Sequence, residues 1–250
     1  MAGKSEYDRS VGTWSPAGRL FQLEYAIQAI KLGTTAIGLV TKEGVLLVVE
    51  KKLANSLIVP KTIQKVFEID HHVGCATAGL LADARMLVDH ARNEAQSHWF
   101  TYNEPLSIES CVNAIADLAL DFADVTDGRR KKTMSRPFGV AMLVGGVNDD
   151  GKPALWVTDP SGTCTEYTAA AIGSAQEGAT SLLSEQYKAD MTLAEAEIVG
   201  VGILRQMMEE KMTTTNIEVA KIPTSTKKYH LYSAAEIESV INRLPAPLEY

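Results

Sequence analysis

The chain has 250 residues, of which 46% are hydrophobic and 22% are charged, an ordinary balance for a globular domain with a substantial core. The formal net charge is −7 and the pI is about 5.3, so the sequence lacks the overall basic footprint of a nucleic-acid-binding protein. The apolar run at 36–49 is broken by the turn-forming residues 41–44 and is too short to cross a membrane. We therefore expect one domain that binds neither nucleic acid nor a membrane.

The first predicted element is a helix over residues 15–32. Ser15 suits the N-cap, Pro16 suits the first helical position, and Gly33 suits the residue just past the end. Apolar residues at three- and four-residue spacing give this helix one apolar face: Leu20, Leu23, Ile27 and Ile30. The helix leads directly into Thr34, at the start of a strand.

Pairs of strands and pairs of helices follow in turn. Strands are predicted at 34–40, 45–50, 65–70, 73–78, 138–147, 154–158, 163–168, 216–222 and 228–232. Helices are predicted at 80–98, 107–123, 175–188, 192–211 and from 233 to just before Pro245. Capping boxes open the last two, Thr192 with Glu195 and Ser233 with Glu236. Strand pairs followed by helix pairs favour antiparallel sheets with helices outside, an α+β fold, over an alternating parallel one.

The side chains that commonly bind metals give weak signals. His71 and His72 lie at a predicted turn between strands with no third ligand nearby, so we interpret them as solvated turn residues and expect no metal. The three cysteines are far apart and form no zinc-type spacing: Cys75, Cys111 and Cys164. The first two lie in apolar segments and are predicted to be buried thiols, which suits a reducing compartment. The N-terminus has no apolar segment typical of a secretory signal.

The one basic run is Arg129-Arg130-Lys131-Lys132. Such a run suits a nuclear-import or polyanion-binding patch. Its polar neighbourhood at 124–135 favours a solvated loop between two elements instead.

Thr34 is the residue with most chemical interest. If the chain were cut after Gly33, its hydroxyl would be a nucleophile and its own α-amine the base, as in a threonine hydrolase. Glu50 ends the strand that pairs with that of Thr34, and Lys65 begins the next, so the three are expected to lie together. In the intact chain the nitrogen of Thr34 is an amide, which cannot replace an α-amine of pKa about 8 as a base. Because a well-formed helix precedes it, we favour a non-catalytic site.

Several motifs resemble those of the α-type subunits of the 20S proteasome, over roughly residues 5–244. The N-terminal signature is Tyr7-Asp8-Arg9 followed by Ser15-Pro16-x-Gly18-Arg19-Leu20-Phe21-Gln22-x-Glu24-Tyr25-Ala26. Supporting motifs are Gly33-Thr34-Thr35-Ala36, Gly79-Leu80-Leu81-Ala82-Asp83-Ala84-Arg85, Ser135-Arg136-Pro137-Phe138-Gly139 and Asp159-Pro160-Ser161-Gly162. Within the family, the stretches 5–7, 98–104 and 216–218 are most similar to the eukaryotic type-5 subunits.

This resemblance implies the N-terminal-nucleophile hydrolase fold, a four-layer αββα sandwich of two antiparallel sheets with an extra N-terminal helix. It divides the single domain 1–250 into a gate tail at 1–14, a helix at 15–32, a sandwich at 33–244 and a tail at 245–250. It implies no cofactor. Thr34, Glu50 and Lys65 match the nucleophile, acid and lysine of the catalytic β subunits, and Ser174 matches a further serine. The Asp and Ser that complete an active site are not evident around 210–217, so Thr34 and Glu50 are expected to be vestigial and the α subunit non-catalytic.

Carried over by position, the functional residues of the family fall into two groups. One group matches the cluster that holds the N-terminal tails at the axial pore: Tyr7, Asp8, Arg9, Pro16 and Tyr25. The other matches the pocket between adjacent α subunits that accepts the C-terminal tail of an activator: Lys65, Gly79 and Leu80. Lys65 offers a cation for a terminal carboxylate, and Gly79 would let a foreign backbone come close. Without the resemblance, Lys65 would be interpreted as a surface strand lysine.

The function implied is that of a structural and gating subunit of the 20S core in ubiquitin-dependent protein degradation. The expected partners are the other α subunits of a hetero-heptameric ring, the β subunits and activator tails, and substrate proteins would pass through the ring. The helix at 15–32 is expected to pack against neighbouring subunits, and the expected location is the cytoplasm and the nucleus. Two alternatives require cleavage before Thr34: an autoprocessed threonine peptidase and a small-molecule amidohydrolase of the same fold.

Overall fold

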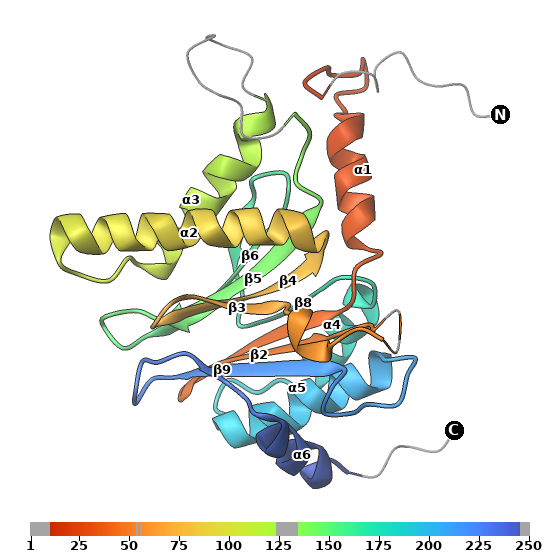
Figure 1. Cartoon of the computed structure of the whole chain (residues 1–250), viewed down its shortest axis with the longest axis vertical. Coiled ribbons are helices and arrows are strands. Elements are labelled where there is room, and N and C mark those ends of the chain that lie inside the picture. The colour runs from red at the N-terminus through yellow and green to blue at the C-terminus, as the bar shows by residue number, and fades with distance from the viewer. Residues whose placement is uncertain (1–10, 54, 56, 124–134, 246–250) are drawn as a thin grey trace.

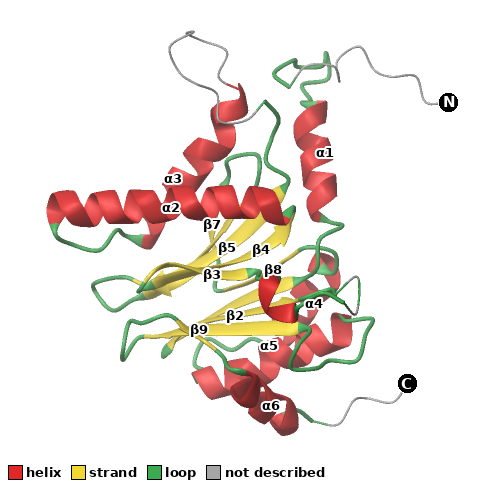
Figure 2. Ribbon diagram, viewed as in Figure 1, coloured by secondary structure: helices red, strands yellow, loops and turns green. Residues whose placement is uncertain are grey.

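Two antiparallel sheets stack face to face between layers of helices (Figures 1 and 2). This computed structural model describes residues 11–53, 55, 57–123 and 135–245. The arrangement confirms the four-layer αββα sandwich that the family resemblance implies. The predictions for residues 1–10 and for the basic run at 129–132 lie outside the described residues.

Each sheet has five strands. The first sheet comprises β1 (Ala36–Thr41), β2 (Gly44–Glu50), β8 (Ala169–Ile172), β9 (Ile217–Pro223) and β10 (His230–Leu231). Its strand order is β10-β9-β2-β1-β8. The second sheet comprises β3 (Val66–Asp70), β4 (Val73–Gly79), β5 (Val140–Val147), β6 (Pro153–Thr158) and β7 (Cys164–Glu166), in that order. Hairpins join β1 to β2 and β3 to β4, as predicted.

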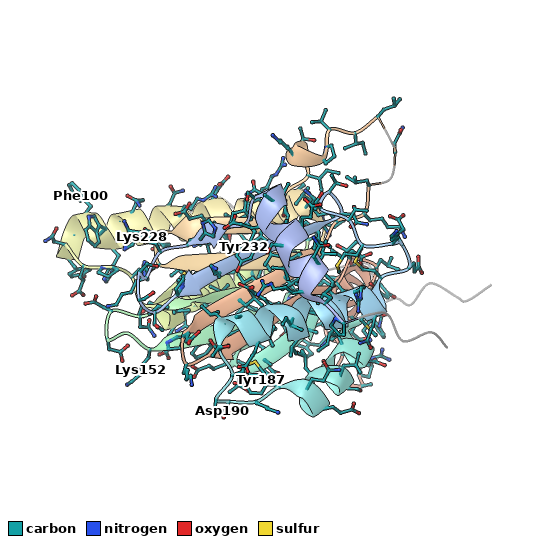
Figure 3. The ribbon with its side chains drawn as sticks, turned by 90° about the horizontal axis from the view of Figure 1, so that it is seen from below. Phe100, Lys152, Tyr187, Asp190, Lys228 and Tyr232 are labelled. Carbon is teal, nitrogen blue, oxygen red and sulfur yellow. The ribbon has the colours of Figure 1, made fainter. Side chains whose placement is uncertain are left out.

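Helices cover the outer faces of both sheets. The second sheet carries α2 (Leu81–Tyr102) and α3 (Ile108–Leu120), which the short helix η3 (Asp121–Ala123) continues. The first sheet carries α4 (Gln176–Gln186), α5 (Leu193–Met207) and α6 (Ala234–Arg243). Figure 3 shows these helices from below, with Phe100 at the far end of α2. A short helix η2 (Pro60–Thr62) precedes β3.

The first helix, α1 (Phe21–Ile30), stands beside the second sheet, on the same side of the sandwich as α2 and α3 and next to the N-terminal end of α2 (Figure 1). None of the helices within the described ranges combines the length and the apolar character that crossing a membrane requires.

Apolar side chains form three layers, one between the sheets and one beneath each helix layer. In β2, Val45, Leu47 and Val49 face the second sheet, whereas Leu46 and Val48 face the helices. All five are fully buried, and each contributes about 1.5–3 kcal/mol relative to an exposed side chain. Burial on both faces explains why this strand is an unbroken apolar run in the sequence.

The N-terminal helix begins at Phe21, so the predicted start at Ser15 is wrong. Gly18 closes a reverse turn by donating its N–H to the carbonyl of Ser15, at 2.9 Å. The Ser15 hydroxyl then accepts the N–H of Arg19, at 3.0 Å, instead of capping a helix. Gly18 has φ +72°, a left-handed conformation that interrupts a helix, so the α-helical turns start only after it.

Strand β8 was not predicted, because 163–168 was interpreted as a single strand. The chain changes sheets between two adjacent residues. The N–H of Tyr167 donates to Leu155 in the second sheet, at 2.8 Å, and the carbonyl of Thr168 accepts from Val40 in the first, at 2.8 Å. The residues that follow are mainly alanines, which have low β-propensity, so the sequence carries little signal for this strand.

Both predicted capping boxes are present. Thr192 and Glu195 exchange side-chain and backbone hydrogen bonds at the start of α5, and Ser233 and Glu236 do so at the start of α6. The ends of the helices were predicted less accurately, since α2 continues to Tyr102 and α5 ends at Met207.

Candidate functional site

The predicted Thr/Glu/Lys set lies together at one end of the sheets. The Lys65 ammonium donates a hydrogen bond to the hydroxyl of Thr34. That hydroxyl donates in turn to the backbone carbonyl of Glu50, at 2.7 Å. The clustering is confirmed, but Glu50 binds Thr34 through its carbonyl group and not through its carboxylate.

Strand pairing brings these residues together. The β1–β2 ladder pairs Ala36 with Val49, and its next bond runs from the N–H of Glu50 to the carbonyl of Thr35, at 3.0 Å. Lys65 directly precedes β3, and its carbonyl accepts the N–H of Thr77 on β4, at 3.1 Å. Two hairpins, one from each sheet, therefore meet at Thr34.

The site holds Lys65 in a partly dehydrated environment. Burial lowers the pKa of Lys65, and the carboxylates of Glu50 and Glu218 partly offset this effect by favouring the charged form. An ammonium with little water around it gains more than a solvated one from an additional anionic partner. Lys65 is thus a suitable cation for an incoming carboxylate.

Glu218 on β9 is the important residue that the sequence analysis missed. One carboxylate oxygen accepts the N–H groups of Lys65 and Val66, at 2.8 and 3.1 Å. The other pairs with the buried ammonium of Lys51, at 3.1 Å, which also donates to the carbonyl of Pro60. Glu218 therefore fixes the backbone that carries Lys65. It reaches this place because β9 pairs with β2, a contact between distant parts of the chain that leaves no local signature.

Thr34 lacks a base in the intact chain, because its nitrogen is a peptide amide. The preceding carbonyl, of Gly33, accepts the N–H of Ser174, at 2.9 Å. The Ser174 hydroxyl lies 3.4 Å from that of Thr35, and Thr35 also accepts the N–H of Ala175, at 3.2 Å. These hydrogen bonds hold residues 33–35 in place as an internal segment of the chain, in which Thr34 is linked to Gly33 by a peptide bond.

Gly79 lies in very close contact with its own chain. A Cβ on Gly33 would overlap the backbone nitrogen of Gly79, and a Cβ on Gly79 would overlap the carbonyl oxygen of Gly139. Gly79 has φ +120°, which side-chain-bearing residues rarely adopt. The close backbone approach expected from a foreign chain at Gly79 is thus made by residues of the same chain. The neighbouring Leu80 remains 46% exposed.

Two of the motifs that carry the family resemblance meet beside this contact. The carboxylate of Asp83, at the start of α2, accepts two hydrogen bonds from the Arg136 guanidinium, at 2.7 and 2.9 Å. It also accepts the N–H of Gly139, at 2.9 Å. Burial raises the pKa of Asp83, but the hydrogen bonds from Arg136 and Gly139 outweigh it, and the net pKa is lowered.

Two of the predicted gate residues lie within the described part of the chain. Pro16 occupies the second position of the reverse turn formed by residues 15–18, as its fixed φ favours. Tyr25 lies on α1, is 50% exposed, and stacks on Phe21 with ring centroids 6.4 Å apart. Tyr7, Asp8 and Arg9 fall outside the described residues.

The cysteines conform to the sequence analysis. Cys75 and Cys111 are buried free thiols, and Cys164 is partly buried. Burial raises the pKa of Cys111 to about 12 and that of Cys75 further, so neither is a reactive thiolate at neutral pH.

Comparison with known proteins identifies two matching family models. The model described as "Proteasome subunit" matches residues 30–222, and the model of the N-terminal signature of A-type proteasome subunits matches residues 7–29. Three curated relatives are named as proteasome alpha type-5 subunits. That of Trypanosoma brucei brucei is 52% identical over 97% of this chain and 98% of its own length. Those of Drosophila melanogaster and Caenorhabditis elegans are 51% and 46% identical, each over 96% of this chain and 98% of their own length.

Replacing Gly79 by alanine is expected to destabilise the protein by at least about 3 kcal/mol, through the unfavourable φ and the overlap with Gly139. Gly151 is a matched control, because it also has a positive φ, +84°, but open space around it. Gly151→Ala should cost only about 1 kcal/mol. Urea unfolding of the purified variants measures both effects, and equal losses would contradict the proposed packing constraint.

Asp83→Asn is expected to lower the free energy of unfolding by about 2 kcal/mol at neutral pH, because it weakens charge-assisted hydrogen bonds. The folded-state pKa of Asp83 lies below its ordinary value of 3.8, so this stabilisation is present above pH 3.8. It disappears as the pH falls through the folded-state pKa, and the difference between wild type and variant should then close.

Asp89→Asn on the same helix is the control. Asp89 is exposed and pairs only at the surface with Arg92, so its loss should change stability by less than about 0.5 kcal/mol at either pH. Urea titrations at neutral pH and below pH 3.8 measure all three proteins. A difference between wild type and Asp83→Asn that is independent of pH would refute the assigned role.

Proposed function

Since the chain belongs to the proteasome subunit family, as an α-type subunit of the 20S core, we propose that it forms part of the α ring, restricts substrate entry and receives activator tails. The observation that carries the proposal is the α-type signature at 7–29, which directly precedes the silent Thr34 site. The similarity to type-5 subunits that the sequence predicts is confirmed by the relatives above.

The subunit is non-catalytic. The segment that precedes Thr34 carries the signature of the α-type subunits, and it ends in a helix whose exit is packed against Gly79. With that segment attached, Thr34 has no α-amine, and its hydroxyl is engaged by Lys65 and the Glu50 carbonyl.

The gate would be formed by the tail ahead of α1. Pro16 turns the chain at the base of this tail, and the tyrosines and acidic group of the signature offer hydrogen bonds to neighbouring tails. Tyr25 supports this role because half of its surface is available on α1 for a contact outside the chain. Activators would act by population shift, binding the open arrangement of the tails better than the closed one.

The activator pocket would be centred on Lys65. Lys65 contacts Thr34, and Gly79 contacts Gly33, so two of the three predicted pocket residues adjoin the segment 33–34. The third, Leu80, directly follows Gly79 and is exposed. A terminal carboxylate would find in Lys65 a partly dehydrated cation, and an apolar tail residue would find Leu80.

The wider role would be in ubiquitin-dependent protein degradation, in the cytoplasm and the nucleus. The partners would be the flanking α subunits, the β ring and an activator, with unfolded protein substrates passing through the ring. The family membership supports assembly with other proteasome subunits. These finer roles are tested through Lys65 and through the N-terminus.

In the reconstituted particle, Lys65→Ala is expected to weaken stimulation of peptide hydrolysis by an activator C-terminal peptide. Loss of one charge-assisted contact should raise the half-maximal peptide concentration by about tenfold or more. Labelling of the β-subunit nucleophile by an active-site probe should not change. Lys61→Ala, in exposed η2, is the control and should leave stimulation unchanged. Wild-type stimulation of the Lys65 variant would exclude the pocket role.

The intact mass of the subunit in the assembled particle should include residues 1–33. The rival function, an autoprocessed threonine peptidase, requires a free α-amine on Thr34 and therefore a chain that begins there. Native mass spectrometry of the particle, followed by release of the subunit, distinguishes the two. A chain that begins at Thr34 would overturn the structural role and restore the catalytic one.

A further inference from the structure

His72 presents a buried nitrogen with no partner. It lies at the turn between β3 and β4 and is only 3% exposed. Its Nε2 lies 2.8 Å from the carbonyl oxygen of Leu106, and because a carbonyl can only accept, Nε2 carries a proton. Its Nδ1 has no hydrogen-bond partner among the residues that the structure describes. Buried polar atoms are almost always paired, so Nδ1 calls for a ligand.

The carboxylate of Asp70 lies next to this nitrogen. Its Oδ2 is 3.7 Å from Nδ1 of His72, which is too long for a hydrogen bond. Its Oδ1 lies 2.9 Å from Nδ1 of His71, on the other side. One ligand atom from each of the three residues falls within 4.8 Å of the others. The lone pair of His72 Nδ1 and the carboxylate of Asp70 therefore face each other with no proton between them, and they repel. A cation bound between them would remove this repulsion.

We propose that Asp70, His71 and His72 form a zinc-binding site at the tip of the β3–β4 hairpin. From the sequence, both histidines are interpreted as solvated turn residues that lack a third ligand; for His72 this is wrong, because its side chain is buried. Asp70, the last residue of β3, supplies the third ligand.

The donor set and its surroundings suit zinc. Two imidazole nitrogens and one carboxylate oxygen are typical zinc ligands, whereas magnesium and calcium prefer oxygen alone. The Leu106 carbonyl orients the His72 ring in the way that outer hydrogen bonds orient zinc-bound histidines. A cavity of about 370 Å³ next to His72 is lined by four carboxylates and one ammonium group: Glu109, Asp149, Asp150 and Glu166 against Lys152. Asp150 pairs with Lys152 and Asp149 with Lys227, so Glu109 and Glu166 supply the excess negative charge that favours a cation.

The required adjustment falls on an exposed side chain. In tetrahedral coordination, ligand atoms about 2.1 Å from the ion lie about 3.4 Å apart, so a spacing of 4.8 Å must shorten by about 1.4 Å. The His71 side chain is half exposed and can make this movement. Its ring also lies 6.3 Å from that of Trp99, edge to face, so the same movement would alter the environment of Trp99.

The test is calorimetric titration of the untagged full-length chain with zinc sulfate, followed in parallel by tryptophan fluorescence. We expect one zinc per chain and a saturable change in emission that Trp99→Phe reduces, with Trp156 in the adjacent cavity supplying the remainder. His71→Gln, His72→Gln and Asp70→Asn should each weaken binding by at least about tenfold, since even outer-shell losses cost that much. His71→Gln keeps the test valid if the His72 variant does not fold, because the His71 side chain is half exposed.

His230→Gln is the matched control. His230 is an exposed histidine 2.7 Å from the carboxylate of Glu236, so it tests whether any surface histidine–carboxylate pair binds zinc. Its affinity should equal that of wild type. The proposal is overturned if the folded wild type shows no stoichiometric binding, or if His71→Gln and Asp70→Asn bind zinc as wild type does. It is equally overturned if His230→Gln loses as much affinity as they do.

Discussion

The contact between the backbones at Gly33, Gly79 and Gly139 is the constraint on which the site depends. No side chain fits there, so the backbone packing fixes the point at which the chain passes from α1 into the sandwich. The chain therefore enters β1 directly beside the end of β4. Thr34 is thereby held against Lys65, and Leu80 is placed at the start of α2. A steric requirement at the backbone thus fixes Thr34 and Leu80, while strand pairing and Glu218 fix Lys65.

The same cluster that would activate a free threonine stabilises an intact chain. Lys65 donates to the Thr34 hydroxyl, and Glu218 holds the Lys65 backbone while neutralising the buried Lys51. A buried, paired charge is costly to uncouple, so this network persists without catalysis because the fold needs it. The ammonium of Lys65 is partly dehydrated and has N–H groups beyond the one that contacts Thr34, and an incoming carboxylate would bind to these.

Local patterns predicted the elements that local chemistry determines, including the hairpins and both capping boxes. They failed where distant residues decide the outcome. Glu218 and the Asp83–Arg136 pair depend on contacts across the chain, and β8 depends on a change of sheet rather than on its alanines. The start of α1 was wrong because the Ser15 hydroxyl caps a turn instead of the helix. The layered arrangement itself came from the family resemblance, which encodes long-range packing that periodicity does not.

The poor burial of α1 has a thermodynamic consequence. Of its ten residues, all of them described, Ile30 alone is buried, while Leu32 just beyond the helix is 88% exposed and Trp14, ahead of the turn that precedes it, is 64% exposed. Helices shorter than about 12 residues are marginal in water without packing. The order of α1 is therefore linked by mass action to whatever covers it. Dilution would lower the fraction of molecules in which α1 is formed before it affects the sandwich, so that fraction reports how completely the subunit is surrounded.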